Sequence, residues 1–381
     1  MVKRKAYPNP MGQLLHLVTL MLLLAAPPEA LAAGSPVVIV ERSEVVHNFT
    51  VDGASVRTMF RDALLQYTKQ TSVKTAWTKG IGITPQDIVG IKISASGGPV
   101  MSSRKPLVAA IAESLAEAGV PAYQIVVWDK LEDELRESEY FPRPEGAPYR
   151  VRSVIPETGF DEHVFYVNEV LGRLIWGDLA FQGIKPGRGQ AQQAQKHGEK
   201  QSVAQMYGRG VSAGSLENQV SNKSYYAQLV TKICTKIINV PVCIDNSGVG
   251  FNGSLASLAL GMVDNTRRFE GEGGNWGDPA IAEILDRPFV RSKVVLHVMD
   301  ALIAQYAGGP DFSPEYTYPL GAIYLSKDPV AIDSLLARRV DSWRAGAHIP
   351  VLKPMLQYMQ TAVEYGLGTA DPKNILLIPL P

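Results

Sequence analysis

Short apolar runs of strand length alternate with amphipathic segments of helical period along most of the chain. Residues 36–40 form the first β-branched run, and residues 56–67 then carry apolar side chains at a helical spacing. This alternation is typical of a mainly parallel sheet with helices on both faces. We therefore predict an α/β fold. Strands are expected at 36–40, 88–93, 125–128, 237–242, 293–299, 322–325 and 375–378, and helices at 56–67, 106–118, 281–285, 330–339 and 355–365.

One polar stretch interrupts the alternation. Residues 183–223 are rich in Gly, Gln, Ser and Lys and show hardly any apolar periodicity. Its Gly-rich pieces, GRGQ and YGRGVSAG, do not follow a strand, so a phosphate-binding loop is not expected there. We predict one large α/β domain over residues 33–381 with this long polar loop inserted in it.

The amino-terminal residues have the pattern of a targeting segment. A basic start, KRK, precedes an apolar run over residues 14–26, and the small residues at 30–32 form an A-x-A cleavage site. We expect residues 1–32 to be the signal peptide of a bacterial protein that is exported to the periplasm. No stable membrane span is expected after its removal. The alternative is an uncleaved segment that anchors the protein in the inner membrane.

Composition argues against two classes of partner. The chain has 37 basic and 37 acidic residues, whereas nucleic-acid-binding proteins normally present a basic face, so no nucleic acid is expected. Its two cysteines, Cys234 and Cys243, are too few for the four thiolates of an iron–sulfur cluster. A strand between them would hold them beyond disulfide reach. We expect two buried free thiols and no cluster.

Polar residues follow several of the expected strands. In an open α/β sheet such residues gather along one edge. Carboxylates beside an imidazole can bind a hard divalent metal or act as an acid/base pair. Asp after a strand is also ordinary turn and helix-capping chemistry, so a structural role stays open. The residues expected at this edge are Ser94, Ser96, Asp129, Asp245, Asn246, His297, Asp300 and Asp328.

Two local patterns sharpen this expectation. In the stretch from residue 237 to 265, a strand should lead into a polar turn with Asp245 and Asn246, and then into an apolar helix. In KDPVAIDSLLARR, Asp328 should cap a helix that begins at a proline. Asp333 falls inside that helix. Because Asp is rarely buried without a partner, we expect it to meet Lys327, Arg338 or a bound ion.

The order and spacing of several motifs resemble one bacterial family, catalogued as the domain-of-unknown-function-362 family. The motifs are DIVGIKIS, KIINVPV, VVLHVMDAL, GGP, GAIYLSKDPVAID and EYGLG, from about residue 87 to the carboxyl terminus. The resemblance implies no settled activity, although many members carry ferredoxin-like iron–sulfur modules. Those cysteines are absent here. Cys243, Ile244 and the turn after them stand where the family has Leu-Lys and then His, and Asn265 is kept without its neighbouring lysine.

The sequence therefore favours a small-ligand or metal site at the carboxyl edge of the sheet, and a divalent metal stays open as its cofactor. A non-catalytic periplasmic binding or accessory protein that has lost the family's chemistry is the alternative, so the sequence does not decide whether the protein is an enzyme. The candidate catalytic residues are Asp245, Asp300, Asp328 and Asp333, and the candidate ligand-binding residues are Ser94, Ser96, Asn246, Asn265 and His297.

Overall fold

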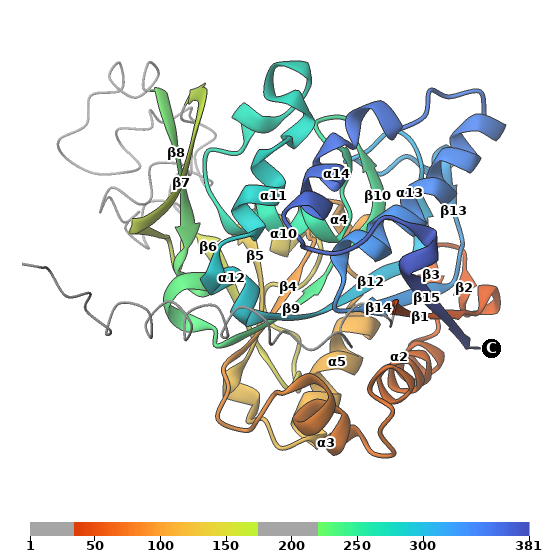
Figure 1. Ribbon diagram of the computed structural model, residues 1–381. Helices are drawn as coiled ribbons and strands as arrows, with labels where there is room; N and C mark the ends of the chain where they lie inside the picture. The colour runs from red at the N-terminus through yellow and green to blue at the C-terminus, as the bar shows by residue number, and fades with distance from the viewer. Residues whose placement is uncertain (1–33, 174–219, 381) are drawn as a thin grey trace, which may run out of the picture. The chain divides into compact units, whose positions relative to one another are not determined.

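A computed structural model describes residues 34–173 and 220–380 (Figure 1). The expected signal peptide and most of the expected polar loop lie outside the described residues. Residues 220–223 were predicted to end that loop, but they begin the strand β8 (Val220–Ala227). No helix in the described ranges is long and apolar enough to cross a membrane.

A mixed sheet of 11 strands organises the residues described from Ser35 onward. Neighbouring strands on its main path are parallel except around β14, which runs antiparallel to both of its neighbours. The path is β15 (Ile375–Leu380), β1 (Ser35–Glu41), β14 (Ala322–Ser326), β12 (Val294–Gln305), β9 (Lys236–Val240), β4 (Val89–Ile93), β5 (Ile125–Leu131) and β6 (Arg150–Ile155). The short strands β10 (Val242–Asn246), β11 (Gly250–Phe251) and β13 (Thr317–Tyr318) lie off this path.

Helices cover both faces of the sheet (Figure 1). The alternation of side chains along the strands builds a separate core on each face: in β5, Ile125 and Val127 join one core, whereas Val126 and Trp128 join the other. The first face carries α2 (Gly53–Thr68), α3 (Val73–Thr75) and α5 (Lys105–Glu117). The second carries α10 (Ser254–Met262), α11 (Ala280–Leu285), α12 (Pro288–Lys293), α13 (Pro329–Gly346) and α14 (Gln357–Glu364). The predicted α/β fold is confirmed.

The described structure also contains two short α-helices and two hairpins. The helices α4 (Gly98–Met101) and α6 (Glu132–Glu137) follow β4 and β5 directly, so they stand at the carboxyl ends of these strands. The hairpins pair β2 (Val46–His47) with β3 (Thr50–Val51), and β7 (Phe160–Arg173) with β8.

Two of the differences between the predicted and observed strands affect candidate residues. The polar turn expected around residues 243–247 is largely the strand β10, which pairs with the second half of β12. Pro241 has no N–H for a ladder and separates β9 from β10, but the chain resumes an extended course because Cys243 and Ile244 are buried apolar side chains. The strand β12 is also longer than expected. Asp300 therefore lies inside the strand instead of beyond its end, whereas His297 falls within both the predicted and the observed strand.

Candidate functional site

A cavity of about 560 Å³ opens at the carboxyl ends of β4 and β5. The strand β10, the helices α6 and α10 and the short helix η6 (Arg267–Phe269) supply the rest of its wall. The lining mixes hydroxyl, amide and charged groups with a few apolar side chains. It consists of Lys92, Ser94, Ser96, Asp129, Lys130, Leu131, Glu134, Ile155, Phe160, Asn246, Asn252, Ser257, Leu260, Gly261, Thr266, Arg267, Glu270 and Pro310.

A buried ion pair forms the inner wall of this cavity. Lys92 Nζ lies 2.9 Å from Asp129 Oδ1, and the two side chains are only 3% and 7% exposed. The ammonium group also donates to the carbonyl of Ile93 at 2.6 Å. The carboxylate accepts from the backbone N–H of Ala95 at 2.7 Å and of Lys130 at 2.8 Å. Because several hydrogen bonds compensate both charges, the pair is a stable, oriented feature of the site.

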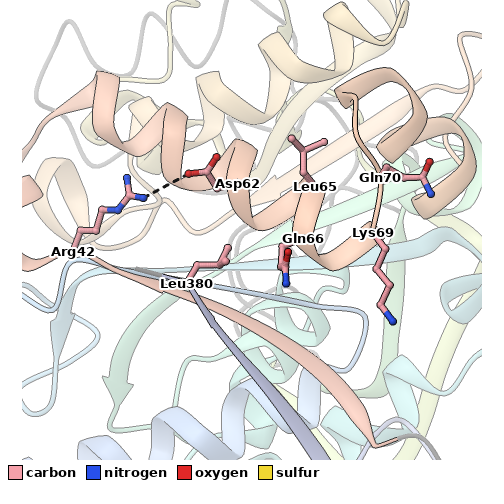
Figure 2. A pocket seen from close by; sticks show the side chains of 7 residues that line it. All are labelled: Arg42, Asp62, Leu65, Gln66, Lys69, Gln70 and Leu380. Carbon is pink, nitrogen blue, oxygen red and sulfur yellow. Dashed lines mark ion pairs between the residues drawn. The ribbon is translucent and has the colours of Figure 1, made fainter.

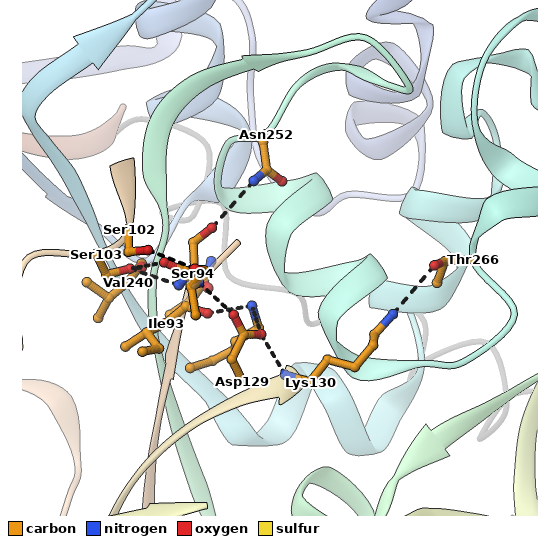
Figure 3. Close-up of polar contacts among 12 residues, drawn as sticks. Ile93, Ser94, Ser102, Ser103, Asp129, Lys130, Val240, Asn252 and Thr266 are labelled. Carbon is orange, nitrogen blue, oxygen red and sulfur yellow. Dashed lines mark hydrogen bonds and ion pairs between the residues drawn. The ribbon is translucent and has the colours of Figure 1, made fainter. Parts of the chain in front are cut away.

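Hydrogen bonds of Ser102 and Ser103 hold the first turn after β4 in place. The hydroxyl of Ser103 donates to the carbonyl of Val240 at 2.5 Å and accepts from the backbone N–H of Ser94 at 2.8 Å. The hydroxyl of Ser102 donates to the carbonyl of Ala95 at 2.8 Å. Figure 3 shows these contacts beside Asp129. The turn therefore presents Ser94 and Ser96 to the cavity on a rigid backbone.

The opposite wall contacts the strand ends through two long polar contacts. Lys130 Nζ lies 3.5 Å from the hydroxyl of Thr266, and the amide of Asn252 lies 3.5 Å from the hydroxyl of Ser94 (Figure 3). At the rim, Arg267 is exposed and makes no ion pair with another described residue. Ser94 and Asn252, which meet only through a long contact, are polar groups that a ligand can engage.

Glu134 of α6 lines the cavity and has a raised pKa. Burial, reinforced by the negative charge of Asp129, raises the pKa of Glu134 to about 7. Within the described part of the chain its carboxyl group has no hydrogen-bond or ion-pair partner, although Lys92 and Lys130 are close enough to lower its pKa partly. A titratable group of this kind in a cleft is a functional-site candidate.

Three of the candidate ligand-binding residues line the cavity: Ser94, Ser96 and Asn246. Asn246 also shapes its own turn, because its side-chain oxygen accepts from the backbone N–H of Gly248 at 2.7 Å. The expected gathering of polar groups at the carboxyl edge is thus present for these residues and for Asp129. The four candidate catalytic aspartates do not line the cavity.

Asp300 and Asp245 have structural partners instead. Asp300 is fully buried and accepts from the backbone N–H and the guanidinium of Arg104, at 2.7 and 3.1 Å. Asp245 accepts from the N–H of Gly309 at 2.9 Å and lies 3.6 Å from Arg344. Burial raises the pKa of Asp245 despite these partners.

Asp333 has a partner that the sequence prediction did not include. It is fully buried and accepts from the first backbone N–H groups of α10, those of Ser254 at 2.6 Å and Leu255 at 2.9 Å. Asp333 of α13 therefore caps a different helix, and the expected pairing with Lys327 or Arg338 is wrong. Burial raises its pKa to about 7 although these hydrogen bonds favour the charged form.

Asp328 caps α13 as expected, accepting from the N–H of Ala331 at 2.8 Å. Its expected place beside the other strand ends is wrong. Because β14 runs antiparallel to β12, its carboxyl end lies at the opposite edge of the sheet, where Asp328 also accepts from the hydroxyl of Ser35 at 2.6 Å. A single reversed strand thus removes this carboxylate from the common edge.

The other two candidates are also part of the framework. His297 is buried in β12 beside Asn239, with 3.1 Å between ring and amide nitrogens, and burial lowers its pKa to about 3. Asn265 adopts a positive φ of 49° and donates to the carbonyls of Ser221 and Lys223. It therefore joins the end of α10 to the β7–β8 hairpin.

The described residues contain no group of three or more His, Cys, Asp or Glu side chains placed to hold a metal ion. Cys234 and Cys243 are buried free thiols, as predicted.

A second cavity, of about 470 Å³, lies beside α2 and the end of β15 (Figure 2). Two of its lining residues, Arg42 and Asp62, form an ion pair of 3.5 Å. The cavity contains none of the residues expected to carry function.

The sequence prediction missed Lys92, Lys130, Glu134 and Arg267. For Lys92 a signal was present, because a lysine in the middle of the apolar run VGIKI must be buried and therefore paired. Glu134 and Arg267 carry no such signal. They reach the cavity only because α6 and η6 are packed against the strand ends.

Comparisons with known proteins agree with the resemblance seen in the sequence. Residues 193–338 match the family described as Domain of unknown function (DUF362). A crystal structure of a protein from Thermotoga maritima is similar over 84% of this chain, at 9% sequence identity and a TM-score of 0.36. The chain spans about 60% of the length of that protein. No curated protein matches the chain.

Proposed function

We propose that the protein binds a small polar molecule in the cavity at the carboxyl ends of β4 and β5, which we call the strand-end cavity. The observation that carries this proposal is the buried Lys92–Asp129 pair. It lines the cavity together with the carboxyl group of Glu134, which has no hydrogen-bond or ion-pair partner among the residues that the structure describes. Buried charges are costly to keep in a purely structural role, and clefts that collect them with perturbed acidities are the usual sites of ligand binding.

The volume and the lining set the class of ligand. About 560 Å³ is the size of a small-molecule site. Hydroxyl groups from Ser94, Ser96 and Ser257 and amides from Asn246 and Asn252 can donate and accept hydrogen bonds on several sides. The ligand is therefore polar and hydrogen-bonding. We further propose that it is bound outside the cytoplasm, because the amino-terminal segment has the pattern of an export signal.

A cavity-filling substitution tests this proposal. Ser257 of α10 is 6% exposed and lines the cavity, so Ser257→Leu should fill part of it. Purified protein is screened by thermal shift against organic acids, amides, amines, sugars and divalent metal ions. We expect at least one class to raise the melting temperature of the wild type and not that of Ser257→Leu. Ser292→Leu, on the exposed side of α12, is the matched control. If no class is discriminated in this way, the proposal is wrong.

A further inference from the structure

We propose that the strand-end cavity takes a small organic acid, whose carboxylate accepts a hydrogen bond from the protonated carboxyl group of Glu134 and lies against Lys130 and Arg267. This inference rests on the proposed function, because it names the chemical class of the ligand for the same cavity. It goes further in assigning Glu134 the role of a hydrogen-bond donor that binds only in its acid form.

The charge balance of the lining favours an anion. Lys92 and Asp129 neutralise each other at 2.9 Å. The remaining charged groups of the lining are Lys130, Arg267, Glu270 and Glu134. With Glu134 protonated they sum to one positive charge, and with Glu134 ionised they sum to zero. A monoanionic carboxylate group therefore completes a neutral site only when Glu134 keeps its proton.

The surroundings of Glu134 also favour its acid form next to such a ligand. From β5 it faces Asp129 and Lys130, and from β4 it faces Lys92. On α6 itself Glu137 adds a further negative charge, while Glu132 pairs with Arg136. From β6, Arg152 is engaged by Glu157 at 2.5 Å, and α4 carries no titratable side chain. Burial and Asp129 already oppose ionisation, and a ligand carboxylate would oppose it further.

A cationic ligand fits these surroundings less well. An amine placed against an ionised Glu134 would also lie near the ammonium groups of Lys92 and Lys130, both of which influence Glu134. Asp129 could not compensate that repulsion, because its two oxygens already accept from Lys92, Ala95 and Lys130. A neutral carboxyl group, in contrast, has one O–H to donate, and Glu134 makes no side-chain hydrogen bond to another described residue.

The proposal predicts proton-linked binding. If only the acid form of Glu134 binds the ligand, affinity is constant well below the pKa of about 7 and falls as pH rises through it. The affinity for an organic acid should then drop about tenfold from pH 6 to pH 8, because each pH unit above the pKa removes about nine-tenths of the acid form. A merely structural Glu134 would produce no such slope.

Calorimetry with a matched set of probes tests the inference. Butanoate and pentanoate, which are monoanions at both pH values, are titrated into the full-length protein at pH 6 and pH 8, beside butanamide and 1,4-diaminobutane. We expect the two acids to bind, more tightly at pH 6, and Glu134→Gln to bind them with no pH dependence, because glutamine mimics the neutral acid. Asp133→Asn, at an exposed position of the same helix, should keep the wild-type pH dependence, because Asp133 is not among the groups that shift the pKa of Glu134. Lys130→Gln should weaken binding at both pH values.

Other outcomes overturn the inference in recognisable ways. Preferential binding of 1,4-diaminobutane, lost in Glu134→Gln, would show that the ligand is a cation. Acid binding without pH dependence in the wild type would show that Glu134 does not act through its proton. If a non-acid class binds in a manner sensitive to Ser257→Leu and both acids fail, the inference is wrong and the proposed function stands. If no class distinguishes Ser257→Leu from the wild type, the proposed function itself fails.

Discussion

Gly261 of α10 occupies a position where any larger residue would collide with the side chain of Lys92. A Cβ atom at position 261 would lie 2.7 Å from Lys92 Nζ and closer still to its Cε. The ammonium group cannot retreat without loss, because it is bound to Asp129 and to the carbonyl of Ile93. The glycine lowers the helix propensity of α10, but its missing side chain leaves the space in which Lys92 forms the buried ion pair at the strand-end cavity.

This relationship gives the first prediction, Gly261→Ala. The added methyl group should displace Lys92 and destabilise the fold by about 1–3 kcal/mol, the usual effect of overpacking a buried site. Gly346→Ala at the end of α13 is the matched control, because a Cβ there meets no atom within 4 Å. That change should be neutral or stabilising by up to about 1 kcal/mol through helix propensity. Urea denaturation measures both. Equal effects of the two substitutions would show that Lys92 tolerates the methyl group.

Asp333 should make stability depend on pH, which gives the second prediction. Its pKa is about 7 in the folded protein, against an ordinary value of 3.8. Between these two pKa values the folded state therefore binds one proton more than the unfolded state. The stabilisation from this proton is complete below about pH 4 and is lost as pH rises through 7. Asp333→Asn removes this titration. We expect the free energy of unfolding to fall less between pH 5 and pH 8 in Asp333→Asn than in the wild type.

The pH effect of Asp333 is separable from its capping role by a second variant. Asp333→Ala leaves the N–H groups of Ser254 and Leu255 without their acceptor, and should cost at least the roughly 0.5–2 kcal/mol of a lost helix cap at every pH. Chemical denaturation at several pH values separates the two effects. A wild-type slope that Asp333→Asn does not change would mean that another group carries the titration.

The third prediction compares two helix caps of different burial. Asp328 caps α13 and is also held by the hydroxyl of Ser35 and the N–H of Thr369, both from distant parts of the chain. The exposed Asp52 caps α2 through local partners, chiefly the N–H of Ser55. Both Ala variants lose a cap that is worth about 0.5–2 kcal/mol. Asp328→Ala should cost more than Asp52→Ala, because it also leaves the half-buried donors of Ser35 and Thr369 without this acceptor. Thermal and urea unfolding rank the two, and the reverse order would contradict the assigned contacts.

The fold was largely predictable from the sequence because its signals are local. The runs around residues 36–40 and 88–93 are apolar on successive positions, as strands buried on both faces require. The helix over 56–67 shows its buried face through Val56, Met59 and Phe60. Asp328 followed by proline marks a helix start, and the structure confirms it.

The direction of a strand and the contacts between distant elements carry no such local signal. Nothing in the run around Ile323 shows that β14 is reversed, yet this reversal places Asp328 at the opposite edge. Asp333 and the start of α10 are 79 residues apart, so their contact depends on how α10 and α13 pack. The strand-end cavity was predictable where its residues follow a strand, as Ser94 does, and not where packing alone supplies them, as with Glu134.

The fourth prediction concerns the two thiols. Burial raises the pKa of Cys234 to about 12 and that of Cys243 higher still, and both side chains are at most 1% exposed. Because the thiolate is the reactive form, neither should react with Ellman's reagent at pH 8 in the folded protein. Both should react once urea unfolds the chain. Ser292→Cys places a thiol on the exposed side of α12 and should react at once, which checks the assay. A fast-reacting thiol in the folded wild type would show that the core shared by Cys234 and Cys243 opens around that residue.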